Sequence, residues 1–332
     1  MIKSTTVLVK DKRGIPCIME RYEKCLHRDV DPTVTGDAVH PMFIIRGKEV
    51  DAIYLPKYIS SMVDGIPYSL PLQTPATGLN FDEVIECHKL KGDGWHTMTA
   101  VEWKFIEDII NLSGKEPHGN TRFGRYHADE SENGIPSASC REVTLTGSGP
   151  DTWYTGHSKD GIADFVGNVW KIVTGMRMVD GKIQYIKNND AAAPDCDMSE
   201  DSMEWVDVLI DGKTLKASFT DGKICFVATD DETVEDYDSS RWKDVGINVG
   251  NIPDYVKALG IFPAKQADND AIVYVDTEEG EKVPFRGGSY THASNAGSSA
   301  LNLSYLRSYA FGNLGFFSAY YEATKRRLLA ET

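Results

Sequence analysis

The sequence predicts an α+β fold with few helices, short strands and long loops. Segments 81–90 and 99–114 carry apolar residues at helical spacing. Asp-Gly dipeptides at 64–65, 180–181 and 221–222 separate strand-like runs, a pattern typical of tight β-hairpins. Long helices do not alternate with the strands, so neither a doubly wound sheet nor a βα-barrel is expected.

The elements can be placed in order along the chain. TTVLV at 5–9 predicts a strand, and residues 49–71 predict strands around the first Asp-Gly turn. Asn80 is a candidate N-cap of the first helix, and Gly114 is a candidate stop for the second. Further along we expect long loops over 115–160, a strand-like run in 161–175, hairpins at the other Asp-Gly turns, a short helix in 253–262 and a basic, helix-like end at 321–330.

Composition and charge narrow the function. Of the 332 residues, 41% are hydrophobic and 10% aromatic, as expected of a packed globular protein. The net charge of −15 argues against a nucleic-acid partner, which requires clustered Lys and Arg, and against binding to an anionic membrane. No stretch approaches the ~20 apolar residues of a membrane span, so no membrane insertion is expected. The start, MIKSTTVLVKDKRG, lacks a secretory-signal pattern, which predicts synthesis in the cytoplasm.

Six cysteines are scattered through the chain without a CxxC spacing. This spacing gives no support to a zinc site or a thioredoxin-like redox site. We therefore expect buried thiols. The cysteines are Cys17, Cys25, Cys87, Cys140, Cys196 and Cys225.

Three segments occur in an order that resembles a known family. They are GDGWHTMTAVEW (92–103), DGIADFVGNVWKIVTG (160–175) and FRGGSY (285–290), the last followed by NLGF (313–316). Together they resemble the C-type lectin-like fold in its formylglycine-generating-enzyme, or sulfatase-modifying-factor, form. The resemblance implies an α+β domain over 49–325, with two helices, short twisted antiparallel sheets and long loops. Residues 1–48 would then be a separate N-terminal segment, and their position alone suggests attachment to a virion or partner.

The C-terminal part resembles a narrower group. RGGSYTHASNAGSSALNLSYLRSYAFGNLGF (286–316) and GMRMVDGKIQYIKNNDAAAPDCD (175–197) are similar to variable proteins of diversity-generating retroelements, which phages and gut bacteria carry. The resemblance implies that 285–321 is a variable ligand-binding region. Its RGG, SNAG, LNL and GF portions would be a constant frame, and the residues between them would be replaceable.

A feature of the sequence is consistent with such diversification. In such retroelements, adenines in the asparagine codons of a template are replaced at random. These codons cannot become codons for Lys, Glu, Gln, Met or Trp, and residues 285–321 contain none of these five residue types. Tyr and Phe offer large rigid contact areas, and Ser, Gly and Asn adapt their hydrogen bonds, so the composition suits a binding surface. The expected ligand-binding residues are Tyr290, Thr291, His292, Ser304, Tyr305, Tyr309, Ala310, Phe311, Gly312 and Phe317. Phe285, Leu301, Leu303 and Phe316 are expected in the core.

The residues argue against catalysis by the family's chemistry. Copper-dependent relatives need paired cysteines in the C-terminal half, whereas the last cysteine here is Cys225, well before RGGSY. Iron-dependent relatives use histidines; the HxD patterns at 27–29 and 127–129 are weak, and we interpret them as solvated loop residues. We therefore expect no enzyme activity and no cofactor.

One acidic segment contains ligands of the kind that calcium prefers. NNDAAAPDCD (188–197) is rich in the hard oxygen ligands that calcium prefers, but it lacks an EF-hand spacing. Lys171 stands where the family's GNVWEW segment has an acidic residue, which weakens a metal role there. An acidic solvated loop is the favoured interpretation.

The expected function is therefore that of a non-catalytic ligand- or receptor-binding display protein. The resemblance implies a place on a phage tail or a cell surface. Its partners would be a host or microbial surface protein or glycan, together with other phage-tail or cell-surface proteins. Two alternatives stay open: a metal-dependent oxidoreductase of the sulfatase-modifying-factor superfamily, and a structural component of a phage tail.

Overall fold

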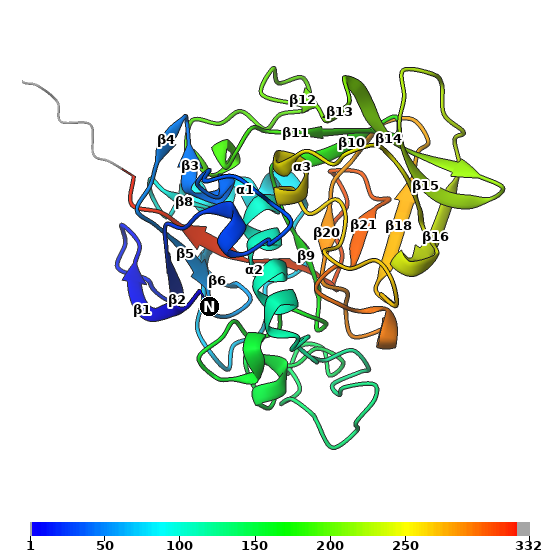
Figure 1. Ribbon diagram of the computed structural model, residues 1–332. Coiled ribbons are helices and arrows are strands. Elements are labelled where there is room, and N and C mark those ends of the chain that lie inside the picture. The colour runs from blue at the N-terminus through cyan, green and yellow to red at the C-terminus, as the bar shows by residue number, and fades with distance from the viewer. Residues whose placement is uncertain (1, 324–332) are drawn as a thin grey trace, which may run out of the picture.

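A computed structural model describes residues 2–323. Helix α2 (Ala100–Ser113) lies at the centre, with a five-stranded sheet on one side and a six-stranded sheet on the other (Figure 1). Phe105 of α2 packs edge-on against Tyr22 of the first sheet at 5.3 Å between ring centroids. Trp103, two residues earlier, turns toward the other side, and its Nε1 donates to the Ser298 carbonyl at 2.8 Å. One helix therefore joins the two sheets through opposite faces.

The five-stranded sheet combines the two ends of the described chain. Its order is β1-β2-β5-β23-β8, and every pairing is antiparallel. The strands are β1 (Ser4–Lys10), β2 (Pro16–Glu23), β5 (Ala52–Pro56), β23 (Ser318–Tyr320) and β8 (Trp95–Thr97). Cys17 and Met19 of β2 are fully buried. Strand β2 lies within residues 1–48 and pairs with β5, so this segment shares a sheet with the rest of the chain. The boundary at residue 48 and an attachment role for this segment stay predictions.

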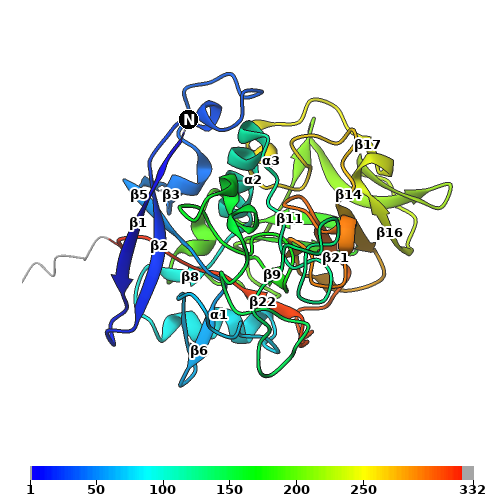
Figure 2. The same cartoon turned by 90° about the horizontal axis from the view of Figure 1, so that it is seen from below.

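The six-stranded sheet carries most of the predicted variable region. Its order is β16-β18-β21-β20-β9-β22, with parallel pairs β18–β21 and β9–β22. The strands are β16 (Tyr237–Arg241), β18 (Ile272–Asp276), β21 (Leu301–Leu303), β20 (Phe285–Arg286), β9 (Trp170–Ile172) and β22 (Leu314–Phe316). Its strands lie opposite the β1–β2 hairpin in both views (Figures 1 and 2).

An eight-stranded sheet closes the remaining side. Its main path is β17-β15-β14-β11-β10-β19, with β12 paired to β11 and β13 to β14. The strands are β10 (Met176–Val179), β11 (Lys182–Tyr185), β12 (Val206–Asp207), β13 (Leu209–Ile210), β14 (Lys213–Thr220), β15 (Lys223–Ala228), β17 (Gly246–Asn248) and β19 (Glu281–Lys282). The predicted hairpins at 180–181 and 221–222 are confirmed as β10–β11 and β14–β15.

The remaining elements are short. Two-stranded sheets pair β3 (Ile44–Ile45) with β4 (Lys48–Glu49), and β6 (Ser61–Val63) with β7 (Ile66–Tyr68), the latter around the predicted turn at 64–65. The other helices are α1 (Phe81–Lys89) and α3 (Asp254–Ala258). Turns of 3₁₀ helix are η1 (His27–Asp29), η2 (Pro41–Phe43), η3 (Asp151–Trp153), η4 (Thr155–His157), η5 (Asp190–Ala192), η6 (Trp242–Asp244) and η7 (Ala293–Asn295).

Both long helices begin and end as the sequence predicts. Asn80 Oδ1 accepts from the Glu83 amide at 3.0 Å at the start of α1, which satisfies a backbone donor that the helix leaves free. Gly114 ends α2 in the left-handed conformation at φ 66°, which glycine adopts without a steric penalty. None of the helices in the described part is long and apolar enough to cross a membrane.

The strand in the run 161–175 is shorter than predicted. Only residues 170–172 of the strand-like run 161–175 form a strand. Asp164, Gly167 and Asn168 all have positive φ (54°, 74° and 61°), and a chain that repeatedly enters the left-handed region cannot continue an extended strand. The helix-like end at 321–330 lies almost wholly outside the described residues. The broad prediction of a mixed fold with few helices and many short strands is confirmed.

Candidate ligand-binding surface

The predicted frame is mostly buried. Its RGG, LNL and GF portions are enclosed, whereas SNAG is partly exposed. Gly287 has φ 85°, and a Cβ there would lie 2.6 Å from the Phe165 carbonyl oxygen. Gly288 has φ 74°, and a Cβ there would lie 2.8 Å from the Ala296 Cβ. Both positions therefore require glycine, for conformation and for space.

Side chains from distant elements fix the turn that leads into β21. Trp103 Nε1 donates to the Ser298 carbonyl at 2.8 Å, and Trp242 Nε1 donates to the Ser299 carbonyl at 2.7 Å. The Glu116 carboxylate accepts from the Ser298 amide at 2.5 Å and from its hydroxyl at 2.9 Å. These bonds tie the turn to α2, to η6 and to the loop after α2, so the backbone beside the replaceable residues is rigid.

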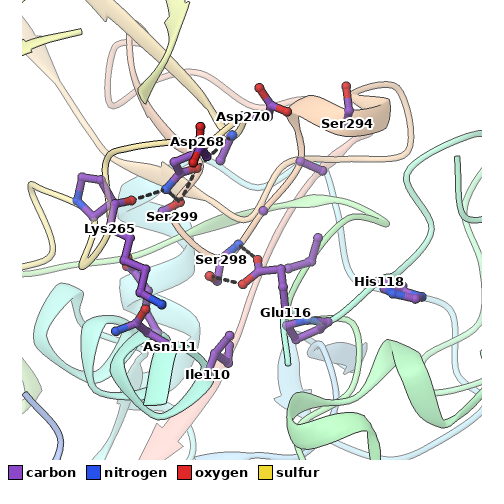
Figure 3. A pocket seen from close by; sticks show the side chains of 18 of the residues that line it. Ile110, Asn111, Glu116, His118, Lys265, Asp268, Asp270, Ser294, Ser298 and Ser299 are labelled. Carbon is purple, nitrogen blue, oxygen red and sulfur yellow. Dashed lines mark hydrogen bonds between the residues drawn. The ribbon is translucent and has the colours of Figure 1, made fainter. Parts of the chain in front are cut away.

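Glu116 lines a polar pocket of about 530 Å³ beneath this turn (Figure 3). The residue as a whole is exposed, but protein atoms surround its carboxylate within the pocket, and desolvation raises its pKa to about 7. His118, which also lines the pocket, stacks on Tyr126 at 4.1 Å and pairs with Glu132 at 2.9 Å. Two of the polar groups of the wall, Glu116 and His118, are thus held by hydrogen bonds to Ser298 and Glu132.

Three aromatic residues that are predicted to be replaceable form a stacked ladder, which extends from buried Phe285 to the surface. Tyr305 stacks on buried Phe285 at 5.7 Å between centroids, Tyr309 stacks on Tyr305 at 3.9 Å, and Phe311 on Tyr309 at 5.9 Å. The planes of successive rings differ by 16–22°. Phe311 is 56% exposed, and Tyr305 and Tyr309 are half-buried. We call these three residues the aromatic ladder; a large exposed aromatic group of this kind marks a contact site more often than chance.

The loop that carries the ladder is held by its own residues and by residues of distant segments. Asn302 Oδ1 accepts from the Ser304 amide at 2.9 Å and from its hydroxyl at 2.8 Å. Arg307 forms an ion pair with Glu281 at 2.5 Å and donates to the Met198 carbonyl at 2.7 Å. The Tyr309 amide closes a turn onto Leu306 at 2.9 Å. Ala310 and Gly312 are exposed beside the ladder, so substitutions at either position meet solvent.

The second predicted contact loop, 290–292, is less exposed. The Ser289 amide donates to His292 Nδ1 at 3.2 Å, and the ring packs edge-on against Trp170 at 4.9 Å. Burial lowers the pKa of His292 to about 4, so the imidazole is neutral near pH 7. Tyr290 is half-buried beside Phe123 at 5.8 Å, and Thr291 is exposed.

Phe317 is a correction to the predicted site. It is only 1% exposed and packs near Phe165 and Trp103, at 6.3 and 6.4 Å between ring centroids. The chain passes from β22 of one sheet to β23 of the other at this point, so Phe316 and Phe317 are both enclosed even though they are adjacent. Phe285, Leu301, Leu303 and Phe316 are buried, as predicted.

The sequence pattern did not single out two aromatic residues near the ladder. Tyr237 of β16 is 55% exposed, and Tyr274 of β18 is half-buried on the same sheet. Both lie outside 285–321. The alternation in IVYVD, residues 272–276, was the available signal, because it places Tyr274 on the face opposite Val273 and Val275.

The histidines and acidic residues that were weighed as metal ligands make other contacts. Among residues 2–323, no group of three or more His, Cys, Asp or Glu could hold a metal ion. His27 is 2% exposed and packs edge-on against buried His40 at 4.7 Å, which corrects its interpretation as a solvated residue. In the 188–197 segment, Arg46 pairs with Asp195 at 3.2 Å, and its amide donates to Asp190 Oδ1. This positive side chain neutralises oxygens that a calcium ion would need.

The six cysteines are free thiols. Cys17, Cys87 and Cys225 are buried, whereas Cys25, Cys140 and Cys196 are only half-buried, so the prediction of buried thiols is right for half of them. Desolvation raises the pKa of Cys87 to about 12. A thiol this far from ionisation is a poor nucleophile and metal ligand.

Comparison with known proteins adds little to this geometry. No protein-family model and no curated protein matches the chain. Among solved structures it is similar to a Major Tropism Determinant U1 Variant, with 12% sequence identity, a TM-score of 0.37, and coverage of 96% of this chain and 72% of the other. A TM-score this low assigns neither a fold nor a function to the chain.

Proposed function

We propose that the protein is a non-catalytic, receptor-binding display protein whose contact surface is the aromatic ladder together with Thr291, Ala310 and Gly312. The observation that carries the proposal is the division within one segment. The RGG, LNL and GF portions of the frame are buried, and the ladder and its neighbours reach the surface. A segment built this way can change its contacts without changing its core.

The finer features of the proposal come from the sequence resemblance. They are a C-type lectin-like fold of the formylglycine-generating-enzyme type, diversification by a retroelement, and a place on a phage tail or a cell surface. The partner would be a host or microbial surface protein or glycan. The rigid turn at 298–299 supports this proposal, because a fixed backbone lowers the entropy cost of presenting exchangeable side chains.

A binding experiment with matched surface variants tests the proposal. The full chain, Phe311→Ala and Leu8→Ala are applied to arrays of bacterial surface proteins and glycans. Phe311 and Leu8 are 56% and 61% exposed, and Leu8 lies on β1 of the other sheet. We expect Phe311→Ala to weaken binding at least about tenfold, as for a central aromatic anchor, and Leu8→Ala to leave it unchanged. Equal binding by all three proteins would contradict the proposal.

Diversification has a separate genetic test. The DNA that flanks the coding sequence should contain a reverse transcriptase and an invariant near-copy of the stretch that encodes 286–317. The two copies should differ at adenines of the template, within codons for Thr291, His292, Ser304, Tyr305 and 309–312. Differences spread over frame codons instead would rule out the retroelement.

A further inference from the structure

Two aromatic side chains outside the variable segment share a sheet face with it. Across the six-stranded sheet, Tyr274 is paired with Asn302, and Asn302 with Phe285, the base of the aromatic ladder. Directly paired residues point to the same face of a sheet. Tyr237 lies two residues before Ser239, the partner of Tyr274, and so points to this face as well.

A contact connects Tyr274 with one of the predicted replaceable positions, His292. Tyr274 packs edge-on against His292 at 6.2 Å and against Trp170 at 6.4 Å. Burial raises the pKa of Tyr237 and of Tyr274, and the nearby Tyr305 hydroxyl raises both further. Strands β18 and β21 are parallel, so Tyr305, which follows β21, emerges at the same end of the sheet as Tyr237. Tyr237 and Tyr274 therefore share one face of the sheet, and the ladder begins at the same end of that sheet.

Two acidic loops border this end of the sheet. Residues 230–236 contain five acidic residues and 277–280 contain two, all of them exposed. The loops are joined, since the Thr277 amide donates to the Asp236 carbonyl at 3.1 Å and Thr277 Oγ1 accepts from the Asp236 amide at 3.0 Å. Within residues 2–323, the salt bridges nearby use Asp270, Asp276 and Glu281 and none of these seven carboxylates. Their charge is free to act on a partner.

The orientation of the rings favours a protein over a sugar or another stacking ligand. Tyr305 and Tyr309 stack on each other at 3.9 Å, so each tyrosine turns one face toward the other ring. Both lie near Phe285, at 5.7 and 6.2 Å, and Phe311 lies beside Tyr309 at 5.9 Å. The stacked pair therefore offers ring edges and hydroxyl groups besides its outer faces. Edges and hydroxyls suit the mixed apolar and polar surface of a protein.

We propose that the ligand surface extends beyond 285–321 onto a fixed flank, formed by Tyr237, Tyr274 and the acidic loops 230–236 and 277–280, and that this flank selects a protein partner with a Lys- and Arg-rich contact surface. Exchange of the ladder residues would then change specificity within one class of partner. The acidic loops would speed association with basic surfaces through long-range attraction. This inference rests on the proposed binding function of the ladder.

Arrays of 15-residue peptides in three matched sets test it, with equal apolar content and net charge +4, 0 or −4. We expect the full chain to bind the basic set, and this binding to fall as salt rises. Tyr237→Ala should weaken it at least about fivefold. Glu278→Lys combined with Glu279→Lys should weaken it at least about tenfold. Both changes are at exposed positions, so circular dichroism should show that the variants fold.

The outcomes separate this inference from the proposed function. If Phe311→Ala loses binding and both flank variants bind fully, the ladder stays part of the ligand-binding surface and the proposed role of the flank is overturned. If only the flank variants lose binding, the role of the flank is supported and the proposed binding function of the ladder is overturned. Preference for the neutral or acidic set, or no binding to any set, would overturn the basic partner. Leu8→Ala is the control, and any loss it shows equal to that of the flank variants would also overturn the inference.

Discussion

Phe311 and Phe317 lie six residues apart in the same predicted variable segment, yet their surroundings are opposite. Phe311 ends the aromatic ladder and is 56% exposed. Phe317 is 1% exposed between the two sheets that α2 joins. The residue type is the same, so the difference arises from the backbone alone. Phe311 lies in a loop, whereas Phe317 lies between β22 and β23, where the chain passes from one sheet to the other.

The comparison shows which positions of this segment would tolerate exchange of their side chains. A replaceable position must lie where the backbone is held by other residues and the side chain itself contributes little to the core. The 304–312 loop meets this condition, because Asn302 and Glu281 hold it from buried positions. Phe317 does not meet it. The residue types that adenine replacement can produce, taken alone, therefore predict too many contact residues.

The largest effect should come from truncating the buried member of the pair. Phe317→Ala removes a fully enclosed ring and leaves a cavity, which should lower the free energy of unfolding by about 3–5 kcal/mol. Phe311→Ala removes a largely solvated ring and should lower it by less than about 1 kcal/mol. Urea denaturation of the two variants measures the difference. Similar losses would show that the ladder is part of the core.

Two glycines in the segment extend the comparison to the backbone. Gly287→Ala forces a Cβ to within 2.6 Å of the Phe165 carbonyl oxygen, at φ 85°. The left-handed conformation alone costs about 1–2 kcal/mol, and the clash adds to it, so we expect a loss of about 2–4 kcal/mol. Gly312→Ala meets no atom within 4 Å and should change stability by less than about 0.5 kcal/mol. Thermal unfolding of both variants checks this contrast between frame and loop.

Acid should affect the two contact loops differently. The folded pKa of His292, about 4, lies below its ordinary value of 6.5, because burial disfavours the charged ring. Its contribution to stability is therefore fully present above pH 6.5 and is lost as the pH falls from 6.5 through 4. One pKa unit corresponds to about 1.4 kcal/mol, so the loss should reach at most about 3 kcal/mol.

The variant His292→Asn separates the contribution of His292 to the pH dependence of stability from the contributions of the other titrating groups. The variant should lose less stability than the unmodified chain between pH 6.5 and pH 4, as measured by urea denaturation at a series of pH values. His88, whose pKa burial lowers to about 3, titrates identically in both proteins and cancels in the difference. A ladder variant such as Tyr309→Ala should leave the pH profile unchanged. Parallel profiles for His292→Asn and the unmodified chain would contradict the assignment.

The sequence predicted the parts of the structure that local chemistry determines. Asn80, Gly114 and the Asp-Gly turns act within a few residues of themselves, and each performs the predicted role. The burial of Phe317 and the place of residues 1–48 in the five-stranded sheet were not predicted, because each depends on pairing between distant strands, β22 with β9 and β2 with β5. Tyr237 was missed for the same reason, since only the register of β16 with β18 brings it toward the ladder.

The smallest expected effect gives the most direct test of the division between frame and replaceable residues. Ala310→Ser and Ala300→Ser add the same hydroxyl to the same segment. Ala310 is exposed, so water solvates the new group and the free energy of unfolding should change by less than about 0.5 kcal/mol. Ala300 is fully buried next to β21, where an added hydroxyl without a partner should cost about 1–3 kcal/mol. Chemical denaturation of the pair resolves a difference of this size. Equal tolerance at both positions would mean that buried positions are as replaceable as the loop, and the boundary drawn between Phe311 and Phe317 would then be lost.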